Sequence, residues 1–122
     1  MNDGDLVGLL LANYSKQYEI YKELLKNLSS GLTENGGKAA IYPIIQILSA
    51  RNRAFDLIKE LDDQITPHKI GWDRRKNDLH TVEAETLKAM LAKIKTILSD
   101  ILVANTKLEN VLAGLQEGSQ AI

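Results

Sequence analysis

Hydrophobic positions between Leu79 and Leu115 recur in steps of three and four, along the longest periodic stretch of the chain. Such steps return side chains to one side of an α-helix, while Lys93 and Lys107 fall on the opposite side. The spacing predicts an amphipathic helix over about 79–116, with a stripe wide enough for a bundle core. The stripe comprises Leu87, Leu91, Ile94, Leu98, Ile101, Leu108, Leu112 and Leu115, widened by Met90, Ile97, Ala104 and Val111.

Two earlier stretches have the same periodicity and predict helices over about 5–28 and about 38–65. The glycine-rich segment 29–37 predicts a connection, and Pro67 and Gly71 within the polar segment 66–78 predict a loop or a frayed turn. We therefore expect one all-α domain over 1–122, an antiparallel three-helix bundle with coiled-coil-like packing and a long C-terminal helix. The first two stripes comprise Val7, Leu10, Leu11, Tyr14, Tyr18, Tyr21, Leu24, Leu25 and Leu28, then Ile44, Ile47, Leu48, Ala54, Phe55, Ile58, Leu61 and Ile65.

Composition narrows the class of protein. The chain has 122 residues, a length that suits one hydrophobic core, and its 44% hydrophobic and 25% charged residues are ordinary for a globular protein. A formal net charge of -1 gives no general attraction to nucleic acid, and the absence of cysteine excludes disulfides and thiol catalysis. No stretch has the ~20 apolar residues that cross a bilayer and none is typical of a signal peptide, so we expect a cytoplasmic protein.

Candidate catalytic and metal-binding groups are few. His80 and Glu83 stand three residues apart, which is too few ligands for zinc or a di-iron centre, so we expect no metal and no cofactor. An exposed histidine on a helical bundle is also typical of a phosphotransfer domain. However, Glu83 would repel a phosphoryl group there, which makes phosphotransfer a remote alternative. No serine, histidine and acid arrangement suggests an enzyme.

A partner-binding surface is predicted where the long third helix extends beyond its neighbours. Its carboxyl half would then carry an uncovered stripe, Ile101, Asn105, Leu108, Leu112 and Leu115, in which the polar Asn105 would select the partner. In the alternative arrangement this half packs beside the first helix and Asn105 meets water.

Two features of the other helices leave alternatives of their own. Tyr14 and Tyr18 either close the rim of the bundle or form the wall of a peptide groove. Arg51 lies within the apolar face of the second helix, where an arginine either extends to solvent or pairs with a carboxylate.

The pattern of the three helices resembles that of the FlgN-like and FliT-like flagellar export chaperones. The resemblance covers about 90 residues. It rests on Tyr18, Leu24 and Leu25 in the first helix; on Ile47, Leu48, Arg51, Ala54, Phe55, Ile58, Leu61 and Asp62 in the second; and on Ile97, Ile101, Asn105, Leu108 and Leu112 in the third.

The resemblance implies a cytosolic chaperone without turnover, which binds an amphipathic helix of a flagellar or type III secreted subunit and prevents its premature assembly. The partner would lie against Ile101, Asn105, Leu108, Leu112, Leu115, Tyr14 and Tyr18. The main alternative is a self-associating scaffold or regulatory bundle, in which the same stripe forms a homodimer and binds no client.

Overall fold

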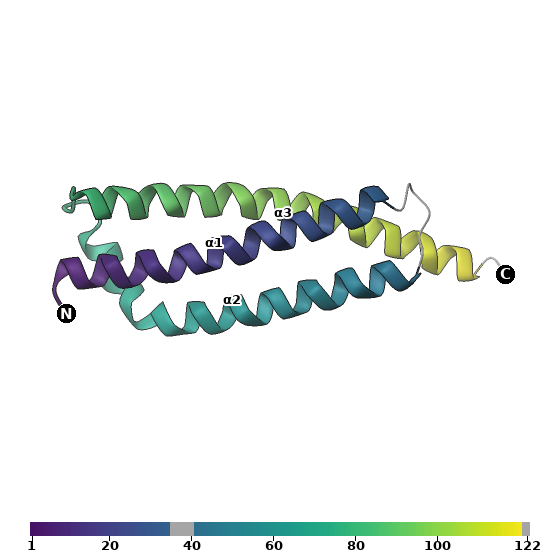
Figure 1. Ribbon diagram of the computed structural model, residues 1–122, viewed down its shortest axis with the longest axis horizontal. Helices are drawn as coiled ribbons and strands as arrows, with labels where there is room; N and C mark the ends of the chain where they lie inside the picture. The colour runs from purple at the N-terminus through teal and green to yellow at the C-terminus, as the bar shows by residue number, and fades with distance from the viewer. Residues whose placement is uncertain (35–40, 121–122) are drawn as a thin grey trace.

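Three α-helices, each antiparallel to the one before it in the chain, form a bundle in the computed structural model (Figure 1). The structure describes the backbone of residues 1–34 and 41–120 and the side chains of residues 1–30 and 44–114. The helices are α1 (Asp3–Glu34), α2 (Ile41–Arg75) and α3 (Val82–Gln120). The predicted all-α, three-helix fold is confirmed.

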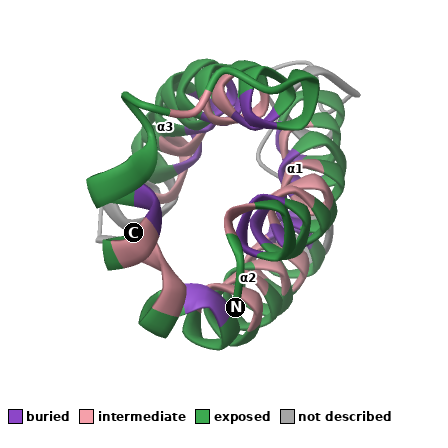
Figure 2. Cartoon of the chain, turned by 90° about the vertical axis from the view of Figure 1, so that its left-hand side faces the viewer, coloured by how far each residue is buried: buried purple, intermediate pink, exposed green. Residues whose placement is uncertain are grey.

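Helix α1 lies between the other two helices. It packs closely against both α2 and α3, whereas among the described residues no Cα atom of α2 lies within 8 Å of a Cα atom of α3. The end-on view shows the three helices arranged around a common interior (Figure 2). One side of the bundle, opposite α1, therefore lies between two helices whose backbones do not approach each other.

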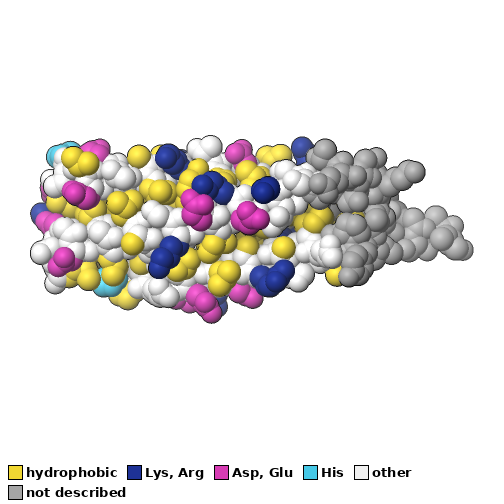
Figure 3. All heavy atoms as spheres, viewed as in Figure 1, with side chains coloured by type: hydrophobic (Ala, Val, Ile, Leu, Met, Phe, Trp, Pro, Cys, Tyr) yellow, Lys and Arg dark blue, Asp and Glu magenta, His cyan; other side chains and the backbone are white. Residues whose placement is uncertain are grey.

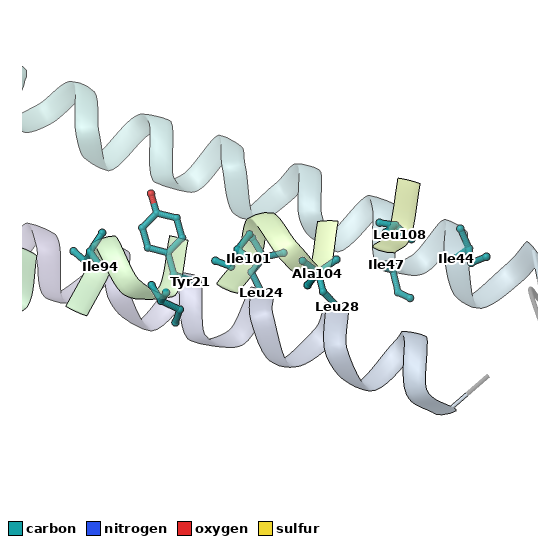
Figure 4. Close-up of a cluster of buried hydrophobic side chains, with 10 residues drawn as sticks. Tyr21, Leu24, Leu28, Ile44, Ile47, Ile94, Ile101, Ala104 and Leu108 are labelled. Carbon is teal, nitrogen blue, oxygen red and sulfur yellow. The ribbon is translucent and has the colours of Figure 1, made fainter. Parts of the chain in front are cut away.

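The larger of two hydrophobic clusters draws side chains from all three helices (Figure 4). Leu28 of α1 and Leu108 of α3 are fully buried in it, with 0% of each residue exposed. The other buried members are Tyr21, Leu24, Ile44, Ile47, Ile94, Ile97, Ile101 and Ala104. Burial of apolar surface at about 25 cal/mol per Å² makes this cluster the main source of stability.

The second cluster closes the opposite end of the bundle and explains why the predicted loop or frayed turn over 66–78 is wrong for residues 66–75, which are helical, whereas 76–78 form a turn. Helix α2 continues through Pro67 to Arg75, with a bend toward its C-terminal end (Figure 1), because Trp72 is buried in a cluster with residues of α1 and α3. A proline inside a helix costs about 3 kcal/mol. Burying 150–250 Å² of a tryptophan offsets this by an upper estimate of about 4 to 6 kcal/mol. The cluster comprises Leu6, Val7, Leu10, Ile65, Trp72, Ala84 and Leu87.

The other helix boundaries also differ from prediction. Helix α1 extends six residues beyond Leu28 to Glu34, so part of the predicted 29–37 connection is helical, and the rest lies outside the described residues. Leu32 follows Leu28 at a four-residue step, a continuation of the stripe that the glycines obscure. Helix α3 begins at Val82 rather than near Leu79, because the Thr81 hydroxyl accepts a 3.2 Å hydrogen bond from the Ala84 N–H and caps the helix.

A buried polar pair on α1 fixes its position against α2. Asn13 and Gln17 are only 7% and 3% exposed. The Asn13 side-chain amide donates a 2.8 Å hydrogen bond to the Leu61 carbonyl oxygen, and the Gln17 amide donates one of 2.8 Å to the Asn13 side-chain oxygen. Buried amides need such partners, so this pair favours one register of α1 on α2.

Candidate functional site: the apolar window between α2 and α3

The separation of α2 from α3 leaves hydrophobic side chains uncovered on the side of the bundle opposite α1. Leu98 and Leu102 on α3 are 41% and 66% exposed, and Phe55 on α2 is 44% exposed. Leu91 lies on the same flank of α3 as Leu98 and Leu102, at helical steps of seven and four. We call this flank, together with Phe55 and Ile58 of α2, the apolar window.

Arg51 bounds the window at one end by bridging α2 to α3. Its guanidinium Nη1 donates a 2.8 Å hydrogen bond to the Asn105 side-chain oxygen and lies 3.2 Å from Oε1 of Glu109. The Arg51 side chain is 18% exposed, and its Nε is buried without a hydrogen-bond partner. Because Asn105 and Glu109 share the window flank of α3 with Leu98 and Leu102, the bridge also identifies that flank as the one facing α2.

The segment of α2 beyond Pro67 bounds the other end, where it crosses toward α3 (Figures 1 and 2). Trp72 from this segment lines a depression together with Tyr14, Lys69, Asp73, Lys76, Lys88 and Leu91. A second depression along α3 also includes Leu91 and continues through Ile94, Lys95, Leu98 and Ser99 to Leu102. The two depressions form one surface that runs along α3 from Trp72 toward the Arg51 bridge.

Two tyrosines of α1 lie beneath this side of the bundle, close to the charged pair Asp62–Lys69. The Lys69 ammonium lies 2.6 Å from an Asp62 carboxylate oxygen. Burial raises the pKa of Tyr14 above its ordinary value of 10.0, and the Asp62 charge raises it further, while Lys69 opposes both. Burial and Asp62 likewise raise the pKa of Tyr21. Both phenols therefore stay neutral and able to donate hydrogen bonds at neutral pH.

The structure places the predicted partner-binding stripe of α3 mostly in the core. Ile101 and Leu108 are 5% and 0% exposed, so the prediction that the carboxyl half is uncovered is wrong for these two residues. The alternative, that this half packs against α1, is confirmed for them, since both lie in a cluster with Leu24 and Leu28. Ile44 and Ile47 of α2 belong to the same cluster, so both neighbouring helices contribute to the core around this half of α3.

The remaining predicted site residues have separate outcomes. Asn105 accepts the hydrogen bond from Arg51, so it pairs within the chain, and Arg51 has both a carboxylate and an amide partner. Leu112, Tyr14 and Tyr18 are half-buried at the edge of the core, and their contact with a partner stays a prediction. The side chain of Leu115 lies outside the described residues.

The hydrophobic pattern alone did not single out the residues that line the window. The pattern places Leu98 and Phe55 in the core stripes and Leu102 in none. The signal in the sequence is the four-residue step from Leu98 to Leu102, which widens the stripe by one further leucine. Their exposure depends on the distance between α2 and α3, which periodicity does not encode.

His80 lies in the turn before α3, not on a helix as the phosphotransfer alternative would place it. Its ring Nδ1 is 3.3 Å from a Glu85 carboxylate oxygen. Hydrogen bonds from Lys88 and then from His80 lower the pKa of Glu85. This surface cluster thus closes the turn around the first residues of α3.

Within residues 1–34 and 41–120, no three His, Cys, Asp or Glu side chains are grouped so that they could hold a metal ion. None of the helices in this described part combines the length and the apolar character that crossing a bilayer requires.

No family model, curated protein or solved structure matches the chain.

Proposed function

We propose that this protein binds an amphipathic helix of a client protein in the apolar window between α2 and α3. The observation that carries the proposal is the exposure of Leu98, Leu102 and Phe55 beside the Arg51 bridge. Leu98 and Leu102 share the α3 flank of Asn105 and Glu109, and Phe55 follows Arg51 by four residues on α2. Uncovered apolar surface bounded by charged residues favours a protein partner. An apolar helix face laid into such a site is the helix-in-groove mode of recognition.

The dimensions of the window set the size of the helix that fits. From Leu91 to Leu102 the α3 flank covers about three turns, or roughly 17 Å at 1.5 Å per residue. A client helix of that length would present apolar residues at steps of three and four toward Leu98 and Leu102. Each apolar side chain covered adds about 1 to 3 kcal/mol before the cost of ordering the client is subtracted. The resulting affinity is modest, which suits a protein that must release what it binds.

The resemblance to flagellar export chaperones supplies the class of client. On this proposal the protein is a cytoplasmic chaperone without turnover, and the client is a helical segment of a flagellar or type III secreted subunit. Covering the apolar face of that segment would prevent its premature assembly. The window replaces the carboxyl half of α3 as the proposed site, because Ile101 and Leu108 are buried.

Capture experiments with two neighbouring substitutions test this proposal. Leu102→Asp places a charge in the window, whereas Val103→Asp places the same charge one residue away on the outer face of α3, at a position of similar exposure (57% against 66%). We expect tagged wild type and the Val103→Asp variant to capture the same subunit from the native host, and Leu102→Asp to lose it. Equal capture by both variants would refute the window as the binding site.

Measuring the mass in solution separates the client-binding function from self-association. A dimer that does not dissociate on dilution and that Leu102→Asp converts to monomer would occupy the window with a second copy. That result would replace the chaperone with a self-associating scaffold. A monomer that captures its client through Leu102 is the expected result.

A further inference from the structure

Lysines gather at the Trp72 end of the apolar window, although the whole chain carries a formal net charge of -1. Lys69, Lys76 and Lys88 line the depression beside Trp72, and Lys95 lines the adjoining depression along α3. Asp73 is the acidic residue among the side chains that line these two depressions. This end of the window is therefore more basic than the chain as a whole.

The hydrogen bonds of these lysines leave donors for a partner. Lys76 lies 3.3 Å from a single Asp73 oxygen, and each lysine ammonium carries three N–H donors. Lys95 has no ion-pair partner among the described side chains. Lys69 and Lys88, in contrast, are engaged by Asp62 and Glu85 at 2.6 Å and 3.1 Å. Lys76 and Lys95 are thus the cations best placed to meet a charge on the client.

The apolar and basic parts of the surface follow each other along one helix flank. Leu91 belongs to both depressions, so the basic end merges with the leucine flank that continues to Leu98 and Leu102. A single bound helix about three turns long would cover both parts. Acidic side chains at one end of that helix would reach the lysines while its apolar stripe covers the leucines.

We propose that the client helix is acidic at the end that lies beside Trp72, with glutamates or aspartates flanking its apolar stripe and facing Lys76 and Lys95. This inference rests on the proposed function, because it names the chemistry of the partner that the window receives. Complementary charge at the rim of an interface selects the partner and accelerates association more than it strengthens the complex. The apolar contacts supply the affinity, and the lysines set the orientation.

Three synthetic helical peptides of about 14 residues test the inference. They share one leucine stripe and carry at one end two glutamates, two glutamines or two lysines. We expect the glutamate peptide to bind wild type about two- to thirtyfold more tightly than the glutamine peptide in fluorescence anisotropy at low salt, because its two exposed ion pairs each add a small favourable contribution. The lysine peptide should bind most weakly, and added salt should reduce these differences.

Two pairs of variants locate the effect. Lys76→Gln with Lys95→Gln should remove the preference for the glutamate peptide, while Lys93→Gln with Lys107→Gln, which removes the same charge outside the window, should retain it. Equal binding of all three peptides to wild type, abolished by Leu102→Asp, would overturn the acidic partner and leave the window as a helix-binding site. Binding of no peptide, or binding that Leu102→Asp does not change, would overturn both proposals.

Discussion

Leu108 and Leu102 lie on the same helix and differ only in what surrounds them, so truncating each to alanine tests where the core of the bundle ends. Leu108 is fully buried against residues from all three helices, whereas Leu102 is 66% exposed. Both substitutions remove the same atoms and change helix propensity equally. The difference between them therefore measures packing alone.

The structure sets the magnitude expected for Leu108→Ala. Truncating a buried leucine to alanine costs about 2 to 5 kcal/mol, the sum of lost apolar burial and the cavity that remains. Around Leu108 the cavity persists, because its buried neighbours Leu28, Ile44 and Ile47 come from α1 and α2, which α3 alone cannot draw inward. We expect Leu108→Ala to lower the free energy of unfolding by about 3 kcal/mol. Leu102→Ala should change the free energy of unfolding by about 0.5 kcal/mol or less.

Urea denaturation monitored by circular dichroism measures both values, since the denaturation midpoint shifts while the slope should stay constant. In thermal unfolding the Leu108→Ala variant should melt about 10 °C below wild type, at roughly 4 °C per kcal/mol for a domain of this size. A cost below about 1 kcal/mol for Leu108→Ala, or an equal cost for Leu102→Ala, would refute the assignment of Leu108 to the core and Leu102 to the surface.

Two further predictions concern the Arg51 bridge and the buried phenols. Arg51→Met keeps the apolar stem but leaves the Asn105 side-chain oxygen without its donor. We therefore expect the free energy of unfolding to fall by about 1 kcal/mol and backbone amides near the bridge to exchange faster. The exposed Arg53→Met serves as the control and should change neither quantity. Burial raises the pKa values of Tyr14 and Tyr21 above 10.0, so their contribution to stability is complete below pH 10 and is lost as the pH rises through the raised values. Replacing both by phenylalanine should therefore flatten the fall in unfolding free energy above pH 10, and an unchanged fall would show that these phenols do not cause it.

The fold followed from the sequence because three long stretches share one period. The stripe from Leu87 to Leu112 predicted α3 because each step of three or four residues repeats the same face. The all-α class and the order of three helices required no further information. The helix ends were predicted less well, because Pro67 and Gly71 are strong local signals that the burial of Trp72 overrides.

The burial of two polar side chains of α1, Asn13 and Gln17, depends on the groups that surround them in the bundle. Asn13 and Gln17 are polar residues outside the predicted stripes, yet they are buried, and the Asn13 amide bonds to the Leu61 carbonyl and to Gln17. A step of three from Leu10 to Asn13 and a step of four from Asn13 to Gln17 place both on the core face, a position that the sequence does show. Which partner each amide would find could not be deduced without the register of α1 on α2.

The site was the least predictable part. Periodicity placed Leu98 and Leu108 on one face of α3, but the structure leaves the first exposed and buries the second. The difference follows from the course of the neighbouring helices: α1 covers the carboxyl half of α3, while α2 remains apart from its middle. The spacing of residues within one helix cannot show where a second helix diverges.

The central claim is that a client helix occupies the window between α2 and α3. The most direct measurement places a photo-crosslinking amino acid at Leu102 or at Val103 in the native host and identifies the adducts by mass spectrometry. We predict that position 102 attaches to an amphipathic helical segment of an exported subunit and that position 103 does not. Equal attachment at both positions, or attachment of position 102 to a second copy of this chain alone, would contradict the account.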